Sequence, residues 1–400
     1  MMSAQFSRRS FIRLTSAGMA GLPFWLSSIP AYAIVGKSVN LEQAIIINAL
    51  GGISNQNIWA ENVTDPDESI GRASIRRMRN LDMRAIRDTH ASGTTAVNVT
   101  LGYVAGPEEP YEHTIDDIAE WNALIRQYPQ ELVKVWTAAD ILNARGEGKI
   151  GVIFGFQNAA SVGDRLDRVR TFANLGVRII QLTYNDRNQI GDGSAVTDNS
   201  GLTSFGHEVV AALNENKVLM DLSHSGERTC LEAARAAQAP FTISHTGCRA
   251  LSDTPRNKTD QELRLVAEKG GVVGIYFMPF LREDGQATAT DVVQHVEHAI
   301  NVCGEDHLGI GTDGDATAID NMEKYRTAIR AEVRQRQNAG VSASGEGHDV
   351  VPLIPDLMGP TQFQKLADLL HARGHSDTRI EKILGRNFLR LFRDVWSGLD

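Results

Sequence analysis

Residues 220–260 read MDLSHSGERTCLEAARAAQAPFTISHTGCRALSDTPRNKTD, and this stretch contains one pattern twice. In each copy a short apolar run ends in Ser-His, which puts His224 after VLMDLS and His245 after FTIS. An Ala-rich segment of high helix propensity, closed by a proline, separates the two copies. The sequence therefore predicts a strand, a helix and a second strand, with a histidine at the carboxyl end of each strand.

Two parallel strands joined by a helix have their carboxyl ends at the same edge of the sheet, so both imidazoles could reach one point. Histidine is the commonest metal ligand in proteins. A histidine at the carboxyl end of a barrel strand is typical of a functional site. We therefore interpret His224 and His245 as a metal-binding pair. The alternative is two histidines that form hydrogen bonds in loops without a metal.

Similar apolar runs recur along the chain, and each ends in a polar or glycine-rich turn. Their near-continuous apolar character is typical of parallel strands that are buried on both faces. Amphipathic helical segments separate them, which gives eight strand–helix units and predicts an α/β fold, a (β/α)8 TIM-type barrel. An open doubly wound sheet is the alternative, and it is disfavoured because no GxGxxG follows the first run. The predicted strands are residues 44–48, 95–99, 150–154, 178–182, 218–222, 241–244, 271–276 and 308–312.

The two ends of the chain depart from this pattern. Residues 1–33 contain the pair Arg8 and Arg9, a short apolar stretch and a final AYA, and so resemble a twin-arginine export signal. We expect export to the periplasm by the twin-arginine machinery, with membrane association if the signal is uncleaved. Residues 34–400 should form one barrel domain. Within it, residues 317–400 should add flanking helices, packed on the barrel as a lid or flank without a core of their own.

The composition of the 400 residues, 42% hydrophobic and 22% charged, is typical of a soluble globular chain. The formal net charge of -9, with no Lys/Arg-rich block in the folded part, argues against binding to nucleic acid. Three cysteines are too few for a disulfide framework. Cys230 and Cys248 lie near the two histidines, so a disulfide or a third metal ligand is an alternative to the buried free thiols that we expect.

The active site of a barrel is built from residues that leave the carboxyl ends of the strands. Asp313, in GIGTDGD, could be a general base, and a capping aspartate in a glycine-rich turn is an equal alternative. Arg256, in DTPRNKTD, could grip a substrate carboxylate, and its alternative is an arginine that bridges loop carbonyls. Asn257 and Tyr276 are further candidate substrate-binding residues. The other polar residues at strand ends are Asn48, Asn98, Gln157, Tyr184, Asn185 and Asp315.

Longer segments resemble the membrane (renal) dipeptidase family of metallopeptidases, which are relatives of the amidohydrolase barrels. They include FANLGVRIIQLTYNDRN, GLTSFGHEVVAALNENKVLMDLSHSGERT, APFTISHTGCRALSDTPRNKTD, GGVVGIYFMPFL and HLGIGTDGD. The resemblance implies a barrel that hydrolyses dipeptides with two zinc ions. In that family the residues that correspond to His224 and His245 hold the second zinc. Asp313 corresponds to the carboxylate of the last strand, and Arg256 to the arginine that holds the substrate's carboxylate.

The chain departs from the family pattern at the first zinc. The family opens its barrel with His-x-Asp, and this sequence has Leu50 and Gly52 at those positions. The bridging glutamate of the family is replaced by Gln157, and an active-site histidine is replaced by Tyr184. A neutral amide is a poor bridging ligand between two dications. The resemblance therefore implies one metal ion here rather than two.

We expect a single divalent ion, with Zn²⁺ as the first choice, held by His224 and His245 with Asp313 or Gln157 as further ligands. The predicted function is hydrolysis of dipeptides or similar short peptides by a water molecule that the ion activates. Tyr184 would polarise the oxyanion.

The alternative function is that of a family member without peptidase activity. Such a protein would bind or mature an exported peptide in the periplasm, as dipeptidase-like proteins do for pyoverdine siderophores. The missing ligands of the first zinc favour this alternative, whereas the retained histidine pair and Arg256 favour hydrolysis. We also allow for a homodimer.

Overall fold

The computed structural model of this chain describes residues 39–62, 80–338 and 350–399. All of them belong to one structural unit, Lys37–Asp400. The expected export signal at residues 1–33 lies outside the described residues, so it stays a prediction.

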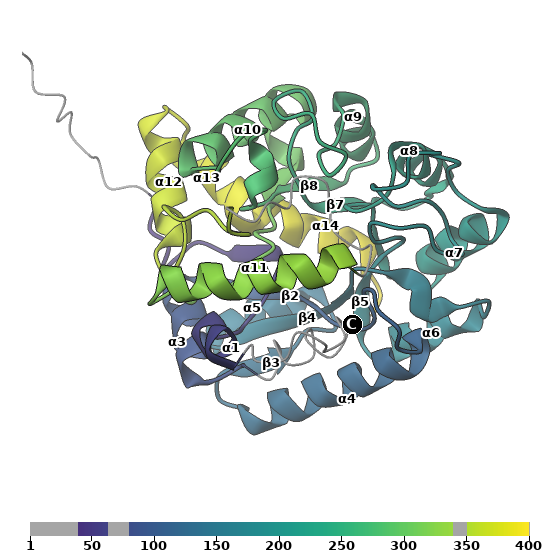
Figure 1. Cartoon of the computed structure of the whole chain (residues 1–400), viewed down its shortest axis with the longest axis horizontal. Coiled ribbons are helices and arrows are strands. Elements are labelled where there is room, and N and C mark those ends of the chain that lie inside the picture. The colour runs from purple at the N-terminus through teal and green to yellow at the C-terminus, as the bar shows by residue number, and fades with distance from the viewer. Residues whose placement is uncertain (1–38, 63–79, 339–349, 400) are drawn as a thin grey trace, which may run out of the picture. The chain divides into compact units, whose positions relative to one another are not determined.

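Eight strands pair in parallel and close into a barrel (Figure 1). They are β1 (Ile46–Gly51), β2 (Thr94–Thr100), β4 (Ile150–Phe156), β5 (Val177–Gln181), β6 (Leu219–Asp221), β7 (Thr242–Thr246), β8 (Val272–Ile275) and β9 (Leu308–Ile310). Hydrogen-bonded neighbours follow the order β2–β1–β9–β8–β7–β6–β5–β4, and pairing between β4 and β2 closes the ring. The predicted (β/α)8 barrel is confirmed, and each of the eight predicted strands overlaps one of these strands.

One further strand, β3 (Leu132–Lys134), has no counterpart in the sequence prediction. It pairs in parallel with the beginning of β4, where Leu132 lies opposite Ile150. The sheet therefore contains nine strands, of which eight form the barrel. Its sequence, LVK, ends in a lysine and lacks the continuous apolar run that marks the barrel strands.

Helices that follow the strands cover the outside of the barrel (Figure 1). Side-chain caps begin several of them: Thr137 forms a capping box with Asp140, and Thr259 forms one with Glu262. Their apolar faces pack against outward-facing strand residues in one large core, except in the helix Ala138–Gly146, whose buried Ala138 and Ile141 belong to a second cluster with inward-facing strand residues. None of the helices in the described ranges combines the length and apolar character that a membrane crossing requires. The outer helices are α3 (Met83–Ala91), α4 (Pro110–Gln127), α5 (Ala138–Gly146), α6 (Asp167–Asn174), α7 (Ser204–Glu215), α8 (Glu227–Ala236), α9 (Asp260–Glu268) and α10 (Ala289–Cys303).

The last helix, α14 (Asn387–Val395), closes the amino-terminal end of the barrel. Its apolar residues, Phe388 among them, pack with inward-facing strand residues such as Ile153 and Leu219. A side chain at position 309 in β9 would overlap the ring of Phe388, so Gly309 makes room for that ring. The barrel interior is therefore filled at this end by the C-terminal helix.

Replacing Phe388 by alanine should lower the free energy of unfolding by about 3–5 kcal/mol, because it leaves a cavity at the centre of the barrel. Phe388 is only 1% exposed, and the neighbouring strand residues cannot easily move to fill the gap. Urea unfolding of the two proteins would measure the difference. Leu399→Ala, at an exposed position near the same end of the chain, should change stability by less than about 0.5 kcal/mol. Similar losses for both variants would contradict the role of α14.

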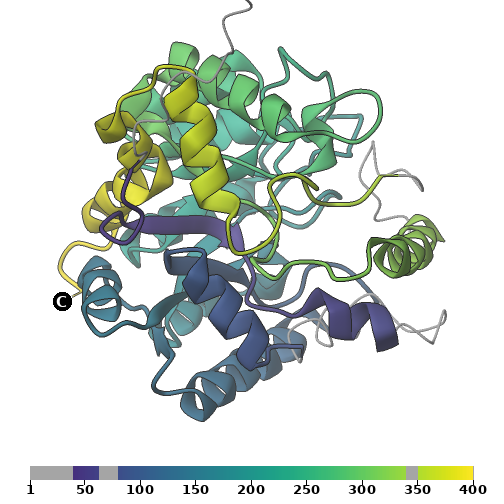
Figure 2. The same ribbon diagram turned by 90° about the vertical axis from the view of Figure 1, so that its left-hand side faces the viewer.

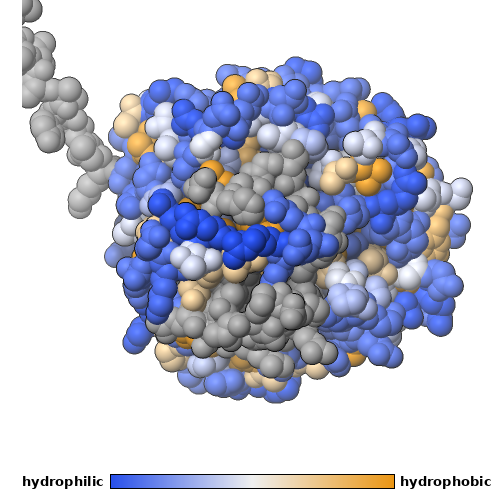
Figure 3. Space-filling view, in the orientation of Figure 1, coloured by the Kyte–Doolittle hydropathy of each residue, from blue (hydrophilic) through white to orange (hydrophobic). Residues whose placement is uncertain are grey.

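The opposite end of the barrel carries a lid. This lid consists of α1 (Gln56–Asn62), α11 (Met322–Asn338) and the segment 350–358. In Figure 1 α11 runs across the front of the barrel, and in Figure 2 it lies at the end of β1 that points away from the C-terminal helices. Its outward side forms a hydrophilic band across this face (Figure 3).

The helices within residues 317–400 pack in two different places. Tyr325 and Ile329 of α11 form a small apolar cluster with Val351, separate from the main core. The expectation that residues 317–400 have no core of their own is therefore wrong for the lid. By contrast, α12 (Gln362–Ala372) and α13 (Asp377–Glu381) contribute residues to the main core around the barrel.

The three cysteines are buried and free, as predicted. Burial raises the pKa of the Cys230 thiol well above its ordinary value and also raises the pKa of Cys248. Such thiols are protonated at neutral pH and unreactive. The alternatives of a disulfide or a third metal ligand therefore find no support in the described residues.

Candidate active site

His224 and His245 face one another at the carboxyl ends of β6 and β7. Their Nε2 atoms lie 3.0 Å apart, and their ring centroids are separated by 5.0 Å. Both side chains are almost completely buried, with exposed fractions of 4% and 0%. The structure thus brings together the two histidines that the sequence singles out.

Hydrogen bonds fix the tautomer of each ring. Nδ1 of His224 lies 2.7 Å from Oδ1 of Asn185, an amide oxygen that only accepts. Nδ1 of His245 lies 2.9 Å from the hydroxyl of Ser244, and that hydroxyl donates its proton to Asp221 at 2.5 Å. Each Nδ1 is therefore a donor, which leaves the lone pairs of both Nε2 atoms facing each other. In this arrangement the two Nε2 atoms are directed to one place, where a cation could bind.

A shared proton is a poor candidate for that cation. Burial lowers the pKa of both histidines well below the ordinary value, and the positive charge of Arg256 lowers it further. Both imidazoles are therefore neutral at neutral pH. Neutral imidazole is the form that binds a metal ion.

Asp221 holds the two histidine-bearing strands together. Its carboxylate accepts hydrogen bonds from the backbone N–H and hydroxyl of Ser223 at 3.0 and 2.5 Å, and from those of Ser244 at 3.1 and 2.5 Å. Burial raises the pKa of Asp221, and these hydrogen bonds oppose that shift. Because Ser223 and Ser244 immediately precede His224 and His245, this buried network fixes the direction of both imidazoles.

The approach of neighbouring strands to Ser244 adds a second constraint. A side chain at Gly274 of β8 or at Gly311, just after β9, would overlap the carbonyl oxygen of Ser244. Only glycine allows the three strands to come this close at the level of the site. These close contacts from β8 and β9, together with the hydrogen bonds to Asp221 of β6, fix the backbone that carries His245.

A cavity of about 240 Å³ opens above the histidine pair. Its polar wall includes His224, Arg256, Asp313, Tyr184 and Gln157. A second cavity of about 200 Å³ lies over β1 and β2 and shares Tyr184, Asp313 and Gln157 with the first. Both cavities are covered in part by α11, so the lid encloses the candidate site.

Arg256 binds a backbone carbonyl, as one interpretation of the sequence suggests, and its role toward a substrate carboxylate stays a prediction. Its Nη1 donates to the carbonyl oxygen of Ser223 at 2.8 Å, and its side chain also lines the cavity. Behind it, the hydroxyl of Tyr276 donates to Asn257 Oδ1 at 2.6 Å. Tyr276 and Asn257 are fully buried and do not occur among the described residues that line the cavity. The structure thus does not bring these two predicted substrate-binding residues to the cavity surface.

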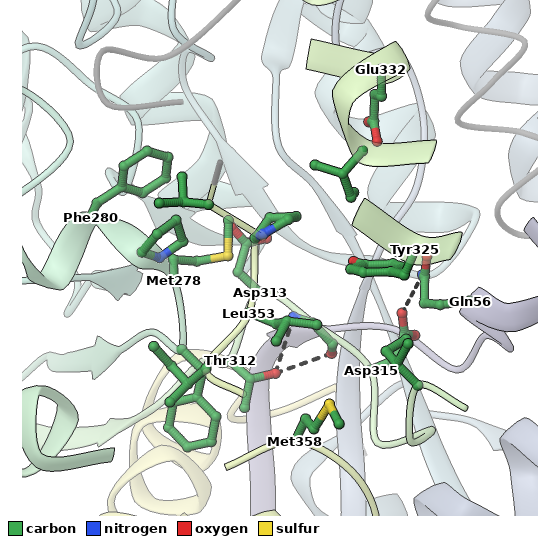
Figure 4. Close-up of a pocket in the computed structure, with 18 of the residues that line it drawn as sticks. Gln56, Met278, Phe280, Thr312, Asp313, Asp315, Tyr325, Glu332, Leu353 and Met358 are labelled. Atoms are coloured by element: carbon green, nitrogen blue, oxygen red, sulfur yellow. Dashed lines mark hydrogen bonds between the residues drawn. The ribbon is translucent and has the colours of Figure 1, made fainter. Parts of the chain in front are cut away.

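Asp313 and Tyr184 both line the cavity, and they come from different strand ends. Asp313 has a left-handed backbone conformation, with φ of 56°, and its N–H donates to the carbonyl of Leu50 at 2.9 Å. This turn directs the residue to the cavity (Figure 4). The ring of Tyr184 stacks on His224 with centroids 4.2 Å apart. Arg336 of α11 lies 3.4 Å from the hydroxyl of Tyr184.

Comparisons with known proteins agree with this architecture. Residues 81–338 match the model of the family described as membrane dipeptidase (peptidase family M19). This chain belongs to the membrane dipeptidase family. An amidohydrolase from Pseudomonas aeruginosa has 30% sequence identity and a TM-score of 0.72, over 89% of this chain and 98% of that one. Dipeptidase aclJ of Aspergillus oryzae is 27% identical over 352 residues, which are 85% of this chain and 74% of that protein. An uncharacterized protein in the pqqA 5′ region of Klebsiella pneumoniae is 28% identical over 302 residues, or 73% of this chain and 99% of the relative.

The position that the sequence suggests for the family's first metal has a glycine, Gly52, with the Asp315 carboxylate beside it. A side chain at Gly52 would overlap Oδ1 of Asp315, so this carboxylate occupies the space next to the glycine. Asp315 is held by the N–H and hydroxyl of Ser54 at 2.9 and 3.0 Å and by Gln56 at 2.6 Å (Figure 4). Gln157 Nε2 donates to Thr100 Oγ1 at 2.7 Å. These side chains are thus held by hydrogen bonds to one another, and the described residues around them contain no group of three or more His, Cys, Asp and Glu side chains for a metal ion.

The histidine pair gains no third acidic ligand from its surroundings. Within the described residues no group of three or more His, Cys, Asp and Glu side chains is close enough to hold a metal ion. The structure therefore does not bring Asp313 to the pair as the third ligand that the sequence suggests. The family is metal-dependent, and in the described residues the two Nε2 atoms are the nitrogen donors that lie together at the cavity.

Two groups of residues at the candidate site are not predicted from the sequence. Asp221 is one, although a carboxylate inside the apolar run VLMDLS is a signal that could have marked it. Glu332 and Arg336 of α11 are the other, and both line the cavities. Their only signal is the polar character of a helix that follows the last strand.

Proposed function

We propose that this chain is a metal-dependent dipeptidase that works with one divalent ion. The observation that carries the proposal is the pair of buried Nε2 atoms of His224 and His245, which face each other at 3.0 Å while each Nδ1 has its own hydrogen-bond partner. Membership of the membrane dipeptidase family supports peptide-bond hydrolysis as the reaction. Zn²⁺ suits two imidazole ligands and is the ion that we expect.

A bound divalent ion would polarise the scissile carbonyl and lower the pKa of a water molecule. The remaining roles fall to side chains of the cavity. Arg256 would bind the substrate's α-carboxylate with its guanidinium. Asp313 would take a proton from the attacking water and give it to the leaving nitrogen as the C–N bond breaks. Tyr184 would donate a hydrogen bond to the carbonyl oxygen as negative charge develops there.

The altered first-metal position favours a second candidate. A family member whose Gly52 position is filled by Asp315 could bind a peptide without cleaving it. Such a protein would act in the binding or maturation of an exported peptide or siderophore. Under either function we propose that the protein is exported to the periplasm, because residues 1–33 contain the twin-arginine pattern.

Metal analysis and a dipeptide panel separate the two candidates. The purified protein, incubated with Zn²⁺ and freed of excess metal, should contain about one ion per chain and should release amino acids from dipeptides. Chelation should abolish the release, and added Zn²⁺ should restore it. Turnover that persists in the chelated protein would contradict the metal-dependent mechanism. One bound ion with binding of peptides and no turnover would support the second candidate instead.

The hydrogen bond from His224 to Asn185 gives a further prediction. Asn185→Ala should weaken Zn²⁺ binding by about 10- to 100-fold, because His224 loses the partner that fixes its tautomer and direction. A competition titration with a chromogenic chelator would measure the affinity. Asn216→Ala, at the end of the outer helix α7, removes an amide of the same kind and should leave the affinity unchanged. Equal affinities of wild type and Asn185→Ala would contradict the orientation of His224 that we describe.

A further inference from the structure

The cavity above the histidine pair has an apolar wall as well as a polar one. Three segments outside the barrel strands form it: the turn after β8, α11 and the segment 350–358. Figure 4 shows several of its side chains around Asp313. We call this wall the apolar lobe, and we define it by Met278, Phe280, Ile329, Val333, Leu353 and Met358.

The residues of the apolar lobe come from two apolar clusters that do not contact each other. Phe280 belongs to the main core, whereas Ile329 and Val333 belong to the small cluster of the lid. All three line the same cavity, so the two clusters face one another across it. An apolar group placed in this space would remove both surfaces from water. The lobe is therefore suited to an apolar part of a ligand.

Arg256 indicates which part of a dipeptide that is. It lines the cavity that contains the apolar lobe, and it is absent from the described lining of the adjoining cavity. If Arg256 holds the C-terminal carboxylate, the side chain of the same residue lies on the side of the lobe. The wall of the adjoining cavity combines Gly51, Gly52, Ser54 and Thr100 with apolar residues such as Ile53 and Val99, so it is Arg256 in the first that distinguishes the two cavities for a carboxylate.

We propose that the apolar lobe binds the side chain of the C-terminal residue of a dipeptide, and that it selects an aromatic or long aliphatic side chain. This inference rests on the proposed function. Met278 and Met358 bring two flexible side chains to the lobe, so it can adapt to more than one apolar shape. The N-terminal residue would occupy the adjoining cavity over β1 and β2.

Two dipeptides of the same composition test the inference. The zinc-loaded protein should hydrolyse Ala-Phe with a kcat/KM about 30-fold or more above that for Phe-Ala, because only Ala-Phe puts its ring in the lobe. Leu353→Ala and Met358→Ala should each lower the ratio of kcat/KM for Ala-Phe to that for Ala-Ala by about tenfold. Met83→Ala, an exposed methionine on α3, is the matched control and should leave the ratio unchanged.

Equal kcat/KM values for Ala-Phe and Phe-Ala would overturn the assignment of the lobe, and so would unchanged ratios in both lobe variants. If no dipeptide is hydrolysed, the proposed function fails, and the lobe is then judged by calorimetric binding of the same two peptides. Binding of Ala-Phe about tenfold tighter than that of Phe-Ala would support the lobe without hydrolysis. Equal binding would overturn it.

Discussion

His245→Ala should remove the bound metal ion and lower kcat/KM for dipeptides by about a thousandfold. His245 contributes one of the two facing Nε2 atoms, and the described residues hold no cluster of His, Cys, Asp and Glu that could take over the ion. An ion that polarises the carbonyl and supplies the nucleophile is worth several kcal/mol in the transition state, and about 4 kcal/mol corresponds to a thousandfold. Metal analysis and steady-state kinetics on the same preparation would measure both effects.

The control for this variant is a histidine outside the site. His90 is exposed at the end of α3, where its Nε2 lies 2.9 Å from the carbonyl of Gly148. His90→Ala should retain one ion per chain and full activity. Circular dichroism should give the same helix content for both variants, since loss of the fold would also lose the metal. A folded His245→Ala protein that keeps its ion and its activity would contradict the proposed metal site.

The eight barrel strands could be predicted because burial on both faces gives continuous apolar runs. The strand β3 could not, since Lys134 interrupts its apolar run, and it forms only where it meets the beginning of β4. The sequence also predicts a helical pair at the C-terminus. It does not say which end of the barrel the last helix closes, because that depends on the fit of Phe388 over Gly309, residues that come from different elements.

The histidine pair could be predicted because two strands joined by one helix are neighbours in a parallel sheet. The groups that orient the pair could not. Asp221 reaches Ser244 only through the register of β6 and β7, in which Asp221 lies opposite Thr242. Arg336 and Tyr184 are 152 positions apart in the sequence, and only the fold brings the guanidinium of Arg336 within 3.4 Å of the Tyr184 hydroxyl. Leu50 and Gly52 suggest a lost metal site in the sequence, but only the structure shows that the Asp315 side chain lies beside Gly52.

Arg256→Met should lower kcat/KM for a dipeptide with a free C-terminal carboxylate by about 100- to 1000-fold, and it should leave the slow hydrolysis of the corresponding dipeptide amide nearly unchanged. Arg256 is only 2% exposed and lines the cavity, so a carboxylate bound there would be paired with a buried guanidinium. Removing one partner of such a pair costs about 2–5 kcal/mol. The wild-type preference for the free acid over the amide should therefore almost vanish in the variant.

The comparison of acid and amide separates recognition of the carboxylate from damage to the site. Arg256 also donates to the carbonyl of Ser223, next to His224, so a purely structural role would lower activity toward both substrates equally. That outcome would contradict the assignment of Arg256 to the carboxylate. Arg256→Lys should recover only part of the preference, because lysine keeps the charge and loses the two parallel donors. Arg249→Met, in the same loop and paired with Glu227 at 3.0 Å, should keep the preference of the wild type. The pattern expected for carboxylate recognition is thus full preference in Arg249→Met, partial preference in Arg256→Lys and almost none in Arg256→Met.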